Sequence, residues 1–107
     1  PLKHYDDRVI RCDFDELCNR NFGSDHYIDV AENSDFIFIS NLPNFSENNS
    51  NQQQRFITLI DIIYEKKIPL MITSEVNLNS IKSYKSMEEP FKRTISRLYE
   101  LTSMNYN

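Results

Sequence analysis

The sequence predicts an α/β fold that is built around a parallel βαβ unit with flanking helices. Two apolar runs, residues 36–39 and 68–73, have the length of buried strands. Between them, residues 53–66 carry apolar side chains at the spacing of a helix, on more than one of its faces. Because a helix that joins two strands of one sheet makes a right-handed crossover, we expect the two strands to be parallel.

Further elements are expected on both sides of this unit. Residues 8–12 should form a strand that leads into a short helix, whose first turn Asp13 and Glu16 would close as a capping box. A second helix is expected to bury one stripe, which consists of Tyr27, Ile28 and Ala31. The last helix should begin after Pro90. Its apolar stripe consists of Phe91, Ile95 and Leu98.

The same apolar runs predict how the elements are covered. Residues 36–39 are apolar without interruption, which is typical of a strand with both faces buried. The helix over residues 53–66 has an apolar surface wider than one face, so we expect it to be sandwiched, with part of its cover supplied from outside this chain. Residues 44–52 are polar and have no period, and we expect them to form a mobile polar loop.

Length, charge and cysteine content limit the class of protein. A chain of 107 residues is long enough for one domain, residues 1–107, with one core. Its formal net charge of −4 argues against a nucleic-acid partner, since such proteins are normally basic. No apolar run approaches the roughly 20 residues of a membrane helix, so no transmembrane segment is expected. Cys12 and Cys18 are expected to be reduced thiols in a core, with a zinc site as a poor second interpretation.

The chain lacks the residues that ATP hydrolysis by a P-loop protein requires. Such a site needs a glycine-rich loop whose N–H groups surround the phosphates, and an acidic strand end that holds magnesium. The sequence contains one glycine, and Ser40 and Asn41 follow the run over residues 36–39. We therefore expect no catalytic residue and no metal site here, and no ATP hydrolysis by this chain alone. The acidic residues near Asp13 are expected to cap a helix.

Charged side chains in the apolar helix are the first candidate functional residues. Arg55 and Asp61 each need a partner if they are buried, because an unpaired buried charge is costly. Asp61 is expected to form a structural salt bridge with Arg93 or Arg97. Arg55 is expected to find its partner in residues 44–52 or across an interface with another domain.

Two arginines in the last helix are the second set of candidates. Arg93 and Arg97 are four residues apart, so they project from one face of the helix, next to Ser96. One interpretation is that Glu100 and solvent neutralise them. The other is that they contact phosphate or the carboxylates of another domain.

Four stretches in a fixed order resemble one protein family: FDELCNRNFGSDHYIDVA, FIFISNLPNF, QRFITLIDIIYEKKIPLMITSEV and FKRTISRLYELTS. They resemble the ZapE-like cell-division ATPases of bacteria and their mitochondrial relatives, the AFG-one-like or lactation-elevated ATPases. The resemblance covers residues 11–103. The positions that match the motifs of the family are Arg55, Phe56, Asp61, Tyr64, Arg93, Ser96 and Arg97. The chain departs from the family at Gln54, which replaces the first arginine of a pair.

The resemblance implies that the chain is the C-terminal α/β region of a P-loop ATPase of the AAA+ type. ATP and magnesium would be bound by an N-terminal nucleotide-binding core, which is absent here, so the chain is expected to be a fragment that binds no cofactor itself. Whether this chain is an enzyme is left open. The arginines at positions 55, 93 and 97 are then candidates for interdomain or phosphate contacts, and the other matching positions for structural charge and packing.

The resemblance also implies a biological setting. The whole protein would act in cell division in the bacterial cytoplasm, or in protein quality control in the mitochondrial matrix. Its partners would be the N-terminal core, a client or division protein, and further copies in an oligomer. The alternative is a stand-alone protein-interaction module, or a truncated reading frame, with no part in ATP turnover.

Overall fold

The computed structural model describes residues 8–103 and has one parallel sheet. Its strands are β1 (Val9–Asp13), β2 (Phe36–Leu42) and β3 (Leu70–Ser74), in the order β1-β2-β3. Both pairs of neighbouring strands are parallel. The βαβ unit predicted from the sequence is confirmed, and the strand expected over residues 8–12 adds a third member to the sheet.

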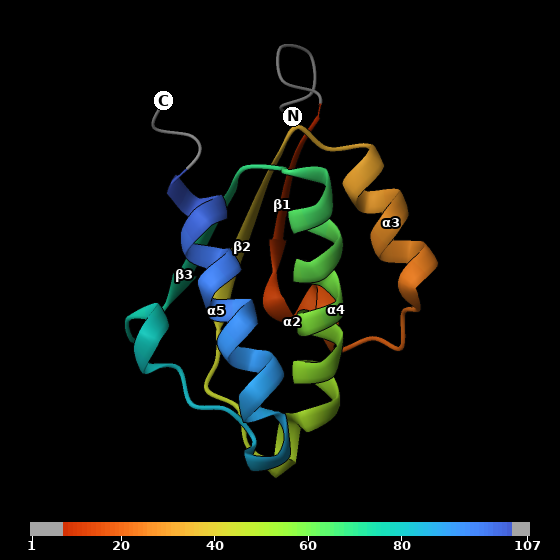
Figure 1. Cartoon of the computed structure of the whole chain (residues 1–107). Coiled ribbons are helices and arrows are strands. Elements are labelled where there is room, and N and C mark those ends of the chain that lie inside the picture. Colours follow the sequence, from red (N-terminus) through yellow and green to blue (C-terminus); the bar gives the residue numbers. More distant parts are fainter. Residues whose placement is uncertain (1–7, 104–107) are drawn as a thin grey trace.

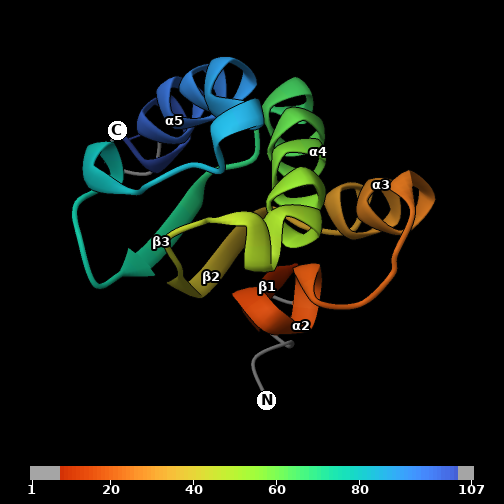
Figure 2. The ribbon, with the colours of Figure 1, turned by 90° about the horizontal axis from the view of Figure 1, so that it is seen from below.

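Three long helices form a layer over one face of this sheet (Figures 1 and 2). They are α3 (Ser24–Glu32), α4 (Ser50–Lys66) and α5 (Glu88–Ser103). Helix α4 lies between α3 and α5, and contacts both. Most of its apolar side chains, such as Ile60 and Ile63, are buried, and Ile62 is half-buried. The prediction of a sandwiched helix is confirmed, whereas the prediction that its cover comes partly from outside the chain is wrong, because α3, α5 and the sheet supply it.

A short helix, α2 (Phe14–Cys18), follows β1 directly. The predicted capping box is present: the Asp13 side chain accepts from the first turn, and the Asp13 N–H donates to Oε1 of Glu16 at 2.8 Å. The next helix differs from the prediction at Ile28, which is exposed, while Tyr27 and Ala31 are buried. Helix α3 therefore buries a narrower stripe than expected.

Residues 44–52 are more ordered in secondary structure than the predicted loop. A single turn of 3-10 helix, η1 (Glu47–Asn49), is capped by Ser46, and α4 already begins at Ser50. Phe45 lies in the core beside Phe14 and Phe56. The polar composition hid this structure, since its polar side chains cap turns instead of facing solvent without partners. Mobility of this segment stays a prediction.

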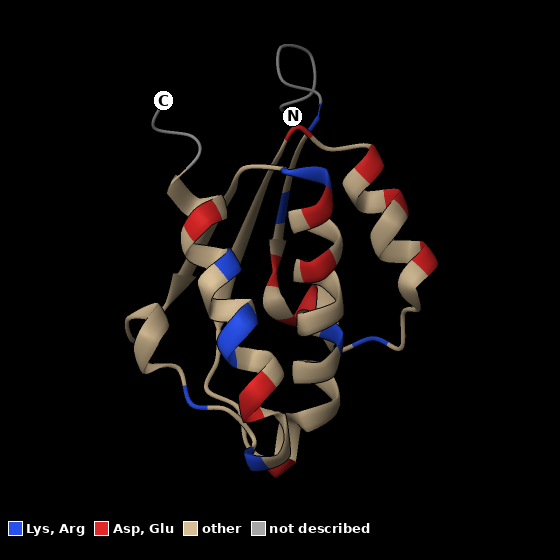
Figure 3. Ribbon diagram, viewed as in Figure 1, with Lys and Arg blue, Asp and Glu red and all other residues tan. Residues whose placement is uncertain are grey.

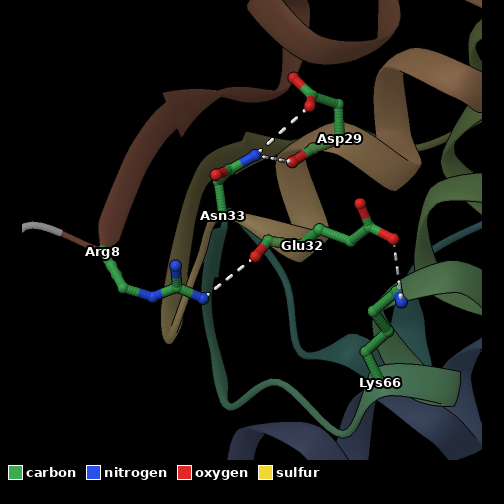
Figure 4. Close-up of polar contacts among 5 residues, drawn as sticks. All are labelled: Arg8, Asp29, Glu32, Asn33 and Lys66. Carbon is green, nitrogen blue, oxygen red and sulfur yellow. Dashed lines mark hydrogen bonds and ion pairs between the residues drawn. The ribbon is translucent and has the colours of Figure 1, made fainter.

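Polar contacts join the end of α3 to β1 and α4 (Figure 4). An Arg8 guanidinium nitrogen donates to the Glu32 carbonyl at 3.0 Å, and Lys66 pairs with the Glu32 carboxylate at 3.5 Å. The Asn33 side chain donates to the Asp29 carbonyl at 2.8 Å. The Arg8 contact satisfies the Glu32 carbonyl, which lies in the last turn of α3, where carbonyls lack a partner within the helix.

The two thiols are free and lie against the core, as the sequence predicts. Cys18 is fully buried, and burial raises its pKa to about 12. Cys12 is half-buried, and burial, with the Glu16 carboxylate as a smaller cause, raises its pKa to about 11. Both thiols therefore stay protonated at neutral pH.

No group of residues suited to a metal ion is found within residues 8–103. Within the same range, no helix is long and apolar enough to cross a membrane.

Candidate functional site

The charged residues of α4 and α5 meet in one cluster, which we call the α4–α5 cluster: Asp61, Tyr64, Lys67, Arg97 and Glu100. Nη1 of Arg97 donates to Oδ1 of Asp61 at 2.5 Å. The same guanidinium lies over the Tyr64 ring, with its carbon 4.7 Å from the ring centroid. The predicted salt bridge of Asp61 is therefore confirmed, with Arg97 as its partner.

Tyr64 lies at the centre of the cluster. Its hydroxyl donates to Oε1 of Glu100 at 2.8 Å, and Nζ of Lys67 lies 3.6 Å from the ring centroid. Lys67 is the C-cap residue of α4, and its left-handed backbone, with a φ of 56°, brings its side chain to this position. Because Asp61 neutralises Arg97, and Glu100 accepts from Tyr64, the interpretation that Glu100 neutralises the arginines is corrected. The cluster opens onto a hollow of about 400 Å³.

The energy of the Asp61–Arg97 pair can be measured with a double-mutant cycle. Asp61→Ala, Arg97→Ala and the double variant are expected to give a coupling energy of about 0.2–1 kcal/mol, because the pair is partly solvated. Arg97 is 28% exposed and Asp61 49%. Urea unfolding of the wild type and the three variants measures this coupling energy. A coupling energy of zero would show that the two side chains do not interact, and Lys92→Ala, at an exposed ion pair with Glu89, is the matched control.

Arg55 and Tyr27 bind the end of α2. Nη1 of Arg55 donates to the Cys18 carbonyl at 2.8 Å, and the Tyr27 hydroxyl donates to the Leu17 carbonyl at 2.7 Å. These are carbonyls of the last turn of a helix, where a positive side chain is favourable. Burial raises the pKa of Tyr27, so its hydroxyl remains a donor. The prediction that Arg55 finds its partner in residues 44–52 is wrong, and its contact with another domain stays a prediction.

Gln53 is a structural residue that the sequence reasoning missed. Its side chain is fully buried at the start of α4. Nε2 donates to Oγ of Ser83 at 2.7 Å, and Oε1 accepts from the Tyr84 N–H at 3.0 Å. Gln53 thus connects α4 to the segment that precedes α5. Its position three residues before Phe56, on the same helical stripe, was the available signal.

The remaining predicted site residues divide into one buried and two exposed positions. Phe56 is fully buried, with its ring centroid 5.8 Å from that of Phe14. Arg93 and Ser96 are exposed on α5. Figure 3 shows positive segments of α5 beside negative segments of α4. Of the three candidate arginines, only Arg93 makes no hydrogen bond or ion pair with another part of residues 8–103.

A second polar group lies where the three strands end. The Asp13 carboxylate accepts from Nδ2 of Asn41 at 2.5 Å and from Oγ of Ser40 at 3.1 Å. These hydrogen bonds, chiefly the one from Asn41, hold the pKa of Asp13 below its usual value. Parallel sheets bind ligands at this end. Here the Asp13 carboxylate binds polar groups at the end of β2 and caps helix α2.

The fold and the cluster define a parallel α/β region whose motif residues hold two helices together. The model of the AFG1-like ATPase family matches residues 2–107, and the chain belongs to this family. The match confirms the family that the four sequence stretches resemble. Two motifs that lie far apart in the sequence, one in α4 and one in α5, meet in space through Asp61 and Arg97.

Two curated relatives place the chain within longer proteins. It is 31% identical over 73 residues to lactation elevated protein 1 homolog B of Danio rerio, a match that covers 68% of this chain and 14% of the relative. It is 26% identical over 101 residues to the cell division protein ZapE of Escherichia coli K12, covering 94% of this chain and 27% of the relative. The chain therefore spans about a quarter or less of these relatives. No solved structure matches it.

Proposed function

We propose that this chain is the C-terminal α/β region of an ATP-hydrolysing protein, in which a separate nucleotide-binding core holds ATP and magnesium. The observation that carries the proposal is the family match over residues 2–107 of a chain that contains one glycine. A chain without a glycine-rich loop lacks the usual means of binding phosphates. Its contribution is then structural and positional, and ATP turnover needs the core.

Within this function, Arg93 is the residue that contacts the core or the phosphates. Arg55 is occupied by the Cys18 carbonyl and Arg97 by Asp61, which makes both of them structural. Arg93 is exposed on α5, one turn before Arg97. A free guanidinium binds phosphate or carboxylate with two parallel hydrogen bonds.

The cellular role proposed for the whole protein follows its relatives. One relative is named a cell division protein and the other a lactation elevated protein. We propose a role in cell division or in mitochondrial protein quality control, in the bacterial cytoplasm or the mitochondrial matrix. A client or division protein and an oligomeric assembly would be the partners.

Arg93→Ala in a polypeptide that joins this chain to the nucleotide-binding core tests the proposal. Loss of charged hydrogen bonds worth about 1.5–3 kcal/mol is expected to lower kcat/KM for ATP by about 10- to 100-fold. Arg93→Lys should recover part of the loss, because it keeps the charge. Circular dichroism checks the fold of each variant.

Lys92→Ala is the matched control for this experiment. Lys92 is the exposed neighbour of Arg93 on α5, and among residues 8–103 it pairs only with Glu89 on the same helix, at 3.1 Å. Its removal is expected to leave ATP hydrolysis unchanged. Wild-type hydrolysis by a folded Arg93→Ala variant would contradict the role of Arg93. Absence of hydrolysis by the joined wild-type polypeptide would favour the stand-alone interaction module.

A further inference from the structure

One face of the sheet is open to solvent within residues 8–103. Register pairs place Val9 beside Phe36, Arg11 beside Phe38, and Phe38 beside Met71, so these five residues share that face. We call it the open sheet face. Phe36 and Phe38 are half-buried and Met71 is 37% exposed. The helix layer lies over the opposite face (Figure 2), where Ile37, Ile39 and Leu70 are fully buried.

The strand order explains why the helices leave this face open. Chain connections run from β1 to β2 and from β2 to β3, each time one position further in the same direction. Right-handed crossovers that advance in one direction place their helices on the same face of a sheet. Helices α3 and α4 therefore lie together, and α5 lies beside α4 (Figures 1 and 2).

The composition of the open sheet face is that of a buried surface. Parallel sheets occur almost only with both faces covered, and their strands then read as continuous apolar runs. Phe36 and Phe38 belong to such a run, and their neighbours Ile37 and Ile39 are fully buried on the other side. The Arg11 guanidinium carbon lies 5.1 Å from the centroid of the Phe38 ring, and leaves much of the apolar surface uncovered.

The unpaired edge of β1 indicates how another part of a longer polypeptide would come to cover the open sheet face. β1 pairs with β2 on one side, and no strand of residues 8–103 pairs with its other edge. Core strands that follow one another outward from that edge run opposite to the direction from β1 to β3. With right-handed connections, their helices then pack on the open sheet face, as in doubly wound α/β sheets.

We propose that the open sheet face is the docking surface for helices of the nucleotide-binding core, supplied by the same polypeptide. The inference rests on the proposed function. Its occupant follows from chain length, because the matched region is 27% of the ZapE relative, which leaves most of that chain to provide helices and strands. Continuation of the sheet past β1 would pair its free edge and cover its open face together.

Thiol labelling at the open sheet face tests the proposal. Phe38→Cys is compared in the 107-residue chain and in the longer polypeptide that includes the core, with a maleimide reagent and peptide mass spectrometry to separate it from Cys12 and Cys18. The introduced thiol is expected to react at a rate at least about tenfold lower in the longer polypeptide, because labelling there requires local opening of the structure. Met71→Cys on β3 is a second reporter in case the first variant does not fold.

Tyr99→Cys is the control, since Tyr99 is 47% exposed and lies on helix α5, not on the open sheet face. It should react at the same rate in both proteins. Equal rates for the introduced thiol at position 38 or 71 would overturn the proposal. Slow labelling in the 107-residue chain, together with a dimer mass by light scattering, would also overturn it, because a second copy of the chain would then cover the open sheet face.

ATP hydrolysis by the same longer polypeptide separates this inference from the proposed function. Hydrolysis with an unprotected position 38 would overturn the docking surface and leave the proposed function standing. Protection without hydrolysis would support the docking surface and contradict the proposed function.

Discussion

Phe56→Ala is expected to lower the free energy of unfolding by about 3–5 kcal/mol, the usual cost of emptying a buried aromatic site. The Phe56 ring packs against Phe14 and Phe45, with centroid distances of 5.8 and 6.2 Å. The three rings come from three separate segments, which limits how far the site can collapse. Urea unfolding followed by circular dichroism measures the loss.

Two further variants define the reason for this loss. Tyr99→Ala removes an aromatic ring that is 47% exposed on α5, and should change stability by less than about 0.5 kcal/mol. Phe56→Leu, which keeps a large apolar side chain, should cost less than Phe56→Ala, because it leaves a smaller cavity. A stability of Phe56→Ala equal to that of Tyr99→Ala would show that the aromatic core is packed differently.

Gln53→Ala is expected to cost about 1–3 kcal/mol, because it empties a fully buried site and leaves the half-buried Tyr84 N–H without its acceptor. The variant also removes the hydrogen bond to Oγ of Ser83. The connection between α4 and the segment before α5 should then open locally. Hydrogen exchange is expected to accelerate at the Tyr84 amide more than at amides of the sheet.

Gln54→Ala is the matched control, because Gln54 is the next residue on α4 and is exposed. Its effect should stay within about 0.5 kcal/mol. If both variants lose the same stability, the loss comes from helix composition, and the buried amide of Gln53 has no special role.

The fold was predictable where one pattern determines the element. The apolar spacing of α4 predicts the helix, and the cost of an unpaired charge predicts that Asp61 binds an arginine of α5. Arg55 shows the limit of this reasoning. Its partner is the carbonyl of Cys18, and a backbone carbonyl at the end of a helix leaves no mark in the sequence.

The cover of the sheet could not be predicted from residue patterns alone. The run from Phe36 to Ile39 predicts two buried faces, and the structure covers one of them with residues of this chain. Which face a helix covers depends on the order and handedness of the connections, which a local pattern does not contain. The difference between pattern and structure at Phe36 and Phe38 is the basis of the proposed docking surface.

An equilibrium titration with a fluorescent ATP analogue tests the central claim most directly. The analogue is added, with magnesium, to the 107-residue chain and to the longer polypeptide that joins it to the nucleotide-binding core. We predict saturable binding by the longer polypeptide and none by the chain alone. Saturable binding by the chain alone, or its absence in the longer polypeptide, would contradict the claim that this region serves an ATPase whose nucleotide site lies elsewhere.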